Sequence, residues 1–126
     1  MVNERIFYRC ETCGNLVEII NSSGVNPVCC GKPMTLLVPN STDASVEKHV
    51  PVITRDGDKI KVTIGAVIHP MLPEHHIEWI VLAQGATTKR VALSPGGEPT
   101  AELCAAEGAV TAYAYCNLHG LWASEA

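Results

Sequence analysis

The feature that most constrains the fold of this chain is a group of four cysteines in its first quarter. Cys10 and Cys13 form a C-x-x-C pair, and Cys29 and Cys30 follow as neighbours. A segment this short buries too little apolar area to fold without a staple. Two cysteine pairs in such a segment are typical of a tetrahedral thiolate metal site. The sequence therefore predicts a small metal-stapled domain over residues 1–37.

Two other interpretations of these cysteines remain. A disulfide between Cys29 and Cys30 is the weaker one, because adjacent cysteines strain the preferred disulfide geometry. Zinc is the stronger one, since four thiolates suit zinc and iron alike. The N-terminal stretch 1–5 lacks the layout of a secretion signal, which predicts a cytoplasmic protein whose thiols stay reduced. Spacing alone does not choose the metal.

Composition excludes several classes of function. A formal net charge of −4 argues against a nucleic-acid-binding protein, which would need basic side chains to neutralise phosphates. The chain contains no apolar run of the roughly 18 residues that a membrane-spanning helix requires. Its 47% hydrophobic and 17% charged residues are typical of a globular protein.

The remainder of the chain, residues 38–126, has the pattern of an antiparallel β-sandwich. The polar stretch 38–45 contains a proline and predicts a linker. Alternating apolar residues over 60–68 predict one half-buried strand that ends at His69. Further short strands are predicted at 50–53, 77–83, 91–93 and 110–115. Short strands at such intervals, with little helical periodicity, favour a sandwich.

A second group of possible metal ligands lies in this part of the chain. Four histidines occupy predicted strand ends or turns, and a cysteine stands three residues before the last of them: His49, His69, His75, Cys116 and His119. Any one of these histidines alone would more often be a hydrogen-bonded or exposed ring. Sandwich loops gather at the ends of the sheets, however, and can bring them together. Imidazoles with one thiolate suit a transition metal, and five ligands leave one octahedral position vacant for a small substrate.

Several motifs in this order closely resemble the desulfoferrodoxin family, the two-iron class of superoxide reductases, over essentially the whole chain. They are Cys10-x-x-Cys13 with Cys29-Cys30, Glu47-Lys48-His49-Val50-Pro51, His69-Pro70-Met71 with His75, and Cys116-Asn117-Leu118-His119-Gly120. The resemblance implies a desulforedoxin-like, rubredoxin-like N-terminal domain that holds one iron on its four cysteines. It also implies an immunoglobulin-like β-sandwich that holds a second, mononuclear iron.

In the second centre the resemblance implies four equatorial histidines, matching His49, His69, His75 and His119. It makes Cys116 the axial ligand, Glu47 a ligand of the ferric state, and Lys48 a cation beside the open face. His76 directly follows His75, but the spacing from His69 selects His75 as the ligand. Cys104 matches no family role, and we expect it to be a buried free thiol.

The function that the resemblance implies is the one-electron reduction of superoxide to hydrogen peroxide without release of oxygen. Family members are usually homodimers and take electrons from rubredoxin-type carriers. The acidic chain would repel superoxide at long range, so we expect Lys48 and the metal to attract it locally. Three rival hypotheses are a pure electron-transfer protein, a superoxide dismutase and a zinc-ribbon interaction module. The last of these would leave the histidines without a role.

Overall fold

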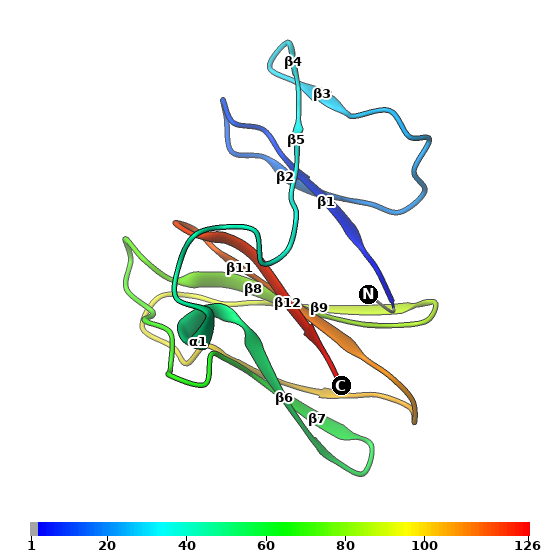
Figure 1. Ribbon diagram of the computed structural model, residues 1–126, viewed down its shortest axis with the longest axis vertical. Helices are drawn as coiled ribbons and strands as arrows, with labels where there is room; N and C mark the ends of the chain where they lie inside the picture. The colour runs from blue at the N-terminus through cyan, green and yellow to red at the C-terminus, as the bar shows by residue number, and fades with distance from the viewer. Residues whose placement is uncertain (1–2) are drawn as a thin grey trace. The chain divides into compact units, whose positions relative to one another are not determined.

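The computed structural model describes residues 3–126, which divide into two compact units (Figure 1). One unit runs from Glu4 to Val38, and the other contains Asn3 and residues 39–126. The first two residues of the predicted 1–37 domain lie outside the described part. Within residues 3–126 no helix has the length and apolar character needed to cross a membrane.

The first unit is built from short antiparallel strands. β1 (Ile6–Arg9) lies between β2 (Leu16–Ile19) and β5 (Thr35–Leu36) in a three-stranded sheet. β3 (Val28–Cys29) pairs with β4 (Lys32–Pro33) in a separate hairpin. The metal-site cysteines therefore lie at the turn after β1 and on the β3–β4 hairpin.

Apolar burial in this unit is small. Its core cluster consists of Tyr8, Cys10 and Met34, against which a few partly buried side chains pack. Large apolar residues such as Ile20 and Val25 are 88% and 76% exposed. The prediction that this segment needs a staple is consistent with such a core.

The second unit is a sandwich of two antiparallel sheets. One sheet has the order β10-β7-β6 and the other β12-β11-β8-β9. The strands are β6 (Pro51–Asp56), β7 (Lys59–Ile64), β8 (Ile77–Gln84), β9 (Thr87–Ala92), β10 (Thr100–Cys104), β11 (Thr111–Cys116) and β12 (Gly120–Glu125). A one-turn helix, α1 (Val46–His49), precedes β6. The predicted architecture, mainly β with a small N-terminal unit and an antiparallel sandwich, is confirmed.

The core of the sandwich lies between the two sheets. Fully buried aliphatic residues of β7 face those of β8 and β11; they include Ile60, Val62, Ile64, Ile77, Ile80, Ala112 and Ala114. Cys116, the last residue of β11, belongs to the same cluster and is 0% exposed. The end of this core thus forms the floor beneath the histidine-bearing loops.

The predicted strand over 60–68 is wrong in its second half. β7 ends at Ile64, and residues 65–68 form a turn that is closed by a 3.0 Å hydrogen bond from the His69 N–H to the Ile64 oxygen. Gly65 has φ +74°, a left-handed conformation that leaves the strand. The alternation continued past the strand by coincidence, and Ile68 is 61% exposed.

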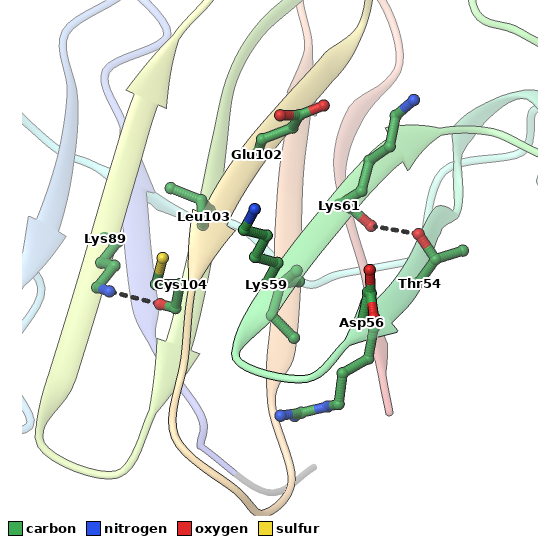
Figure 2. A pocket seen from close by; sticks show the side chains of 10 residues that line it. Thr54, Asp56, Lys59, Lys61, Lys89, Glu102, Leu103 and Cys104 are labelled. Atoms are coloured by element: carbon green, nitrogen blue, oxygen red, sulfur yellow. Dashed lines mark hydrogen bonds between the residues drawn. The ribbon is translucent and has the colours of Figure 1, made fainter.

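The prediction that Cys104 is buried is also wrong. Cys104 is exposed and is the last residue of β10, an edge strand. Ala101 and Leu103 face inward on this strand, so its alternation turns Glu102 and Cys104 outward. Cys104 lines a surface hollow of about 700 Å³ with β6 and β7, and Lys89 donates a hydrogen bond to the Cys104 carbonyl there (Figure 2).

Candidate metal centres

The four cysteines of the first unit converge on one point. The sulfur atoms of Cys10, Cys13, Cys29 and Cys30 all lie within 4.8 Å of one another. Both sulfur pairs sit on tight turns: Gly14 follows the first pair with φ +83°, and Cys30 itself has φ +53°. The Cys13 N–H points at the Cys10 sulfur across 3.4 Å. These turns aim four thiols inward, as a four-thiolate metal site requires.

Proton affinities in this cluster differ strongly between thiols. The backbone N–H of Cys13 lowers the pKa of Cys10 to about 6. Hydrogen bonding with Cys13 raises the pKa of Cys30 to about 12. Without a cation the cluster holds some of its thiols protonated, because four thiolates this close repel one another. A divalent or trivalent metal removes that repulsion, and the set of donors fits it.

The four predicted histidine ligands of the second unit form a square. The ring centroids along its sides are 4.7 Å (His49–His69), 4.7 Å (His69–His75), 5.1 Å (His75–His119) and 4.9 Å (His119–His49) apart. The diagonal from His49 to His75 is 6.4 Å. Rings that share a side cross at 72° to 89°, whereas the rings on this diagonal are tilted by only 31°. Four imidazoles thus surround one central point.

The hydrogen bonds of two rings fix which nitrogen faces that point. The Nδ1–H of His49 donates to the Ser45 carbonyl at 2.6 Å, and the Nδ1–H of His69 donates to the Pro70 carbonyl at 2.7 Å. A neutral ring that carries its proton on Nδ1 presents a lone pair on Nε2. His119 presents Nδ1, which lies 3.1 Å from the His49 Nε2.

Two nitrogens in the square are left without a partner. Among the described residues, neither the buried Nε2 of His69 nor that of His75 has a hydrogen-bond partner. An unsatisfied buried polar atom costs roughly 1–3 kcal/mol. A metal ion at the centre of the square would satisfy both atoms, so the residues fit a metal.

Burial keeps three of these imidazoles, those of His49, His69 and His75, neutral. It lowers the pKa of His49 and His75 and lowers that of His69 to about 4. The charge of Lys48 adds a smaller effect in the same direction at His49 and His75, so this cation acts on the square. Neutral imidazole is the form that binds a metal.

Cys116 supplies a thiol from beneath the square. Its sulfur lies within 4.8 Å of the donor atoms of His49, His75 and His119, and 3.9 Å from the Nδ1 of His119. Burial raises the pKa of this thiol, while the backbone N–H groups of Leu118 and His119 act to lower it. Cys116 is 0% exposed, whereas His75 and His119 are partly exposed. The cluster is therefore closed at Cys116 and more open at His75 and His119.

A side chain that sequence reasoning missed holds the His75 loop. Asn117 accepts a hydrogen bond from the His76 N–H at 2.9 Å and donates one to the Glu74 carbonyl at 3.0 Å. The backbone N–H of Asn117 donates to the His76 carbonyl at 3.1 Å. These bonds flank His75 on both sides and tie its loop to the turn that carries His119. The only sequence signal was the position of Asn117 beside Cys116.

Trp122 is a second residue that sequence reasoning did not assign. Its indole stacks on the His49 ring at 4.8 Å and 24° and donates a hydrogen bond to the His119 carbonyl at 3.1 Å. His76, the alternative to His75, does not join the square; its Nδ1 lies 3.0 Å from the Leu72 carbonyl. Glu47 and Lys48 are exposed on α1, directly before the buried His49.

Comparison with known proteins gives matches along nearly the whole chain. Residues 41–125 match the family described as desulfoferrodoxin, and residues 3–37 match the desulfoferrodoxin N-terminal domain. A desulfoferrodoxin from Nitratidesulfovibrio vulgaris is 45% identical over 100% of both chains. A superoxide reductase from Pyrococcus horikoshii is 40% identical, covering 68% of this chain and 90% of its own length.

A solved structure agrees with these sequence matches. The crystal structure of the superoxide reductase from Treponema pallidum has a TM-score of 0.78 at 30% identity and covers 96% of this chain and 98% of its own. The four-cysteine cluster and the cluster of histidines with Cys116 match the two iron centres of the family. This chain belongs to the desulfoferrodoxin family.

Proposed function

We propose that this protein is a superoxide reductase, which converts superoxide, one electron and two protons into hydrogen peroxide and forms no oxygen. The observation that carries this proposal is the square of four imidazoles with a fully buried thiol beside it and two partly exposed rings, those of His75 and His119. A saturated electron-transfer site would not need an accessible side. Superoxide reductases among the relatives and solved structures support the same reaction.

The residues that would hold the two irons are proposed as follows. The first iron would bind Cys10, Cys13, Cys29 and Cys30, and the second would bind His49, His69, His75 and His119 together with the Cys116 thiolate. When bound, the second iron supplies the electron and a coordination position for a small anion. Every other part of the reaction falls to the side chains around it.

We assign Lys48 to attraction of the substrate and Glu47 to protection of the open side. The Lys48 charge lowers the pKa of His49 and His75 slightly, which supports a position of this cation near the square. The electric field of one cation can attract the superoxide anion here, because salt screens it little over distances shorter than the Debye length, which is about 10 Å at moderate salt. Lys48 also orders water from which protons reach the reduced substrate. Glu47, its neighbour, would offer a carboxylate to the oxidised centre.

The reaction is tested by its products. The reduced, iron-loaded protein is mixed anaerobically with superoxide, and hydrogen peroxide and oxygen are both measured. A reductase gives one peroxide for each superoxide consumed and no oxygen. A superoxide dismutase would release oxygen, and a pure electron carrier would give no rapid consumption; either result would contradict the proposal.

Replacing Lys48 with alanine tests its role. We expect the bimolecular rate constant with superoxide to fall by roughly tenfold at low salt, since local steering is lost. Its dependence on ionic strength should weaken as well. As a control, Lys59→Ala removes one positive charge at the start of β7, the end of that strand away from the turn that carries His69. This variant should leave the rate nearly unchanged. Equal rates for wild type and Lys48→Ala at low salt would remove Lys48 from the mechanism.

The remaining assignments rest on the family and on the chain's composition. We propose an iron domain over residues 1–37 and a reductase domain over 38–126, in line with family matches at 3–37 and 41–125. We further propose a homodimer that receives electrons from a rubredoxin-type carrier. Cytoplasm is the proposed compartment, because free cysteines suit a reducing environment.

A further inference from the structure

The helix that carries Glu47 and Lys48 has little side-chain packing of its own. α1 spans only Val46–His49, and His49 is its one buried residue. Val46, Glu47 and Lys48 are all exposed. A helix of one turn is not stable by itself in water. Apart from the buried His49 ring, its position therefore comes from contacts made by its backbone.

Gly65 makes the closest of these contacts. A methyl group at this position would lie 2.5 Å from the Glu47 carbonyl oxygen, 2.5 Å from the Lys48 carbonyl carbon and 2.7 Å from the Lys48 Cα. All three are backbone atoms, so no flexible side chain can move aside. Only glycine lets the turn after β7 approach α1 this closely.

A hydrogen bond joins the same two segments. The Val67 N–H, two residues after Gly65, donates to the Glu47 carbonyl at 2.9 Å. The turn 65–68 is itself closed by the bond from the His69 N–H to Ile64. One rigid turn therefore carries His69 at its end and supports the Glu47–Lys48 backbone on its side.

We propose that Gly65 is a positioning residue for Glu47 and Lys48, which holds both residues beside the histidine square through its close contact with their backbone. The expected effect on the rate with superoxide rests on the proposed function. The contact between Gly65 and the Glu47–Lys48 backbone does not depend on that function. A side chain at position 65 would push the helix backbone away and displace the Lys48 charge. Displacements of about 1 Å at a site can lower rates by up to roughly a hundredfold.

The test compares two glycines at opposite ends of β7. Gly57, in the β6–β7 turn, has φ +62° and open space around its Cα, whereas Gly65 has φ +74° and the α1 backbone against it. Alanine at either position adds left-handed strain, and asparagine tolerates that conformation. We expect Gly65→Ala and Gly65→Asn in the iron-loaded protein to lower the rate constant with superoxide by up to roughly tenfold, which is the loss expected for Lys48→Ala. The matching Gly57 variants should keep the wild-type rate.

A double-mutant cycle distinguishes positioning from general damage. If Gly65 acts through Lys48, Gly65→Ala should change the rate little in a Lys48→Ala background. Equal effects in both backgrounds, or loss of the metal absorption spectrum in both Gly65 variants, would overturn the proposal.

Amide hydrogen exchange at Val67 gives a readout that does not depend on activity. The wild-type amide should be protected although the Val67 side chain is 50% exposed, and Gly65→Asn should expose it to exchange. An unprotected Val67 amide in the wild type would overturn the proposal even if the Gly65 variants failed to fold. A Lys48→Ala variant with normal activity would instead refute the role of Lys48, while protection at Val67 would still support the contact.

Discussion

Removing the metal from the four-cysteine cluster is expected to unfold the segment from Glu4 to Val38 and to leave the sandwich folded. The buried apolar residues of this unit are few: Phe7, Tyr8, Cys10 and Met34, with a few partly buried neighbours. Metal binding supplies about 10–16 kcal/mol in small structural zinc sites, which is far more than such a core contributes. Without metal the pKa of Cys30 is raised to about 12, so this thiol stays protonated at neutral pH. The metal-free cluster therefore adds little electrostatic stabilisation to the unit.

The metal is removed with a chelator, and amide hydrogen exchange is then measured separately for individual peptides of the protein. Peptides from residues 4–38 should lose protection, while those from β8 and β11 keep it. Both tryptophans, Trp79 and Trp122, lie in the sandwich, so their fluorescence should stay native. Persistent protection across 4–38 in metal-free protein would show that the apolar core is sufficient.

Two exposed cysteines provide a matched pair of variants. Cys13 and Cys104 are both exposed, so serine in either place costs little packing. Cys13→Ser removes a metal ligand and should destabilise the first unit, whereas Cys104→Ser should leave it unchanged. Equal stability of the two variants would exclude Cys13 as a ligand.

The parts of the structure that the sequence predicts well are those determined by local pattern. The C-x-x-C pair, the glycines that follow cysteines and the apolar run in Ile77–Gln84 each act within a few residues. β10 and β12 were not predicted. β10 is half-exposed with a weak alternation, and β12 follows directly from the ligand turn at Gly120.

The square of histidines depends on long-range contacts that no local pattern contains. Its corners come from α1, the turn after β7, the loop before β8 and the β11–β12 turn, which only the sandwich topology brings together. The supports of the square are harder still to predict. Ser45 acts through its carbonyl and Gly65 through the absence of a side chain, so residue type gives no direct signal of either role.

Replacing Cys116 with serine should produce the largest change at the second centre. Serine is close in size to cysteine, and the backbone N–H groups of Leu118 and His119 that face the sulfur can face a hydroxyl oxygen equally well. The fold should therefore survive. A hydroxyl deprotonates far less readily than a thiol, however, so the variant presents a neutral, weak ligand beneath the square.

Two consequences of Cys116→Ser are expected. The visible absorption that arises from charge transfer between thiolate and iron at this centre should disappear, and the affinity of the square for metal should fall by at least roughly tenfold. The absorption of the four-cysteine centre should remain and serves as an internal reference, and Cys104→Ser should change neither property. Because imidazole binds a metal as a neutral ligand, the fully buried Cys116 is the one donor in this cluster that brings a negative charge to the metal. Survival of the charge-transfer band in Cys116→Ser would therefore assign it to another residue and would refute Cys116 as the axial ligand.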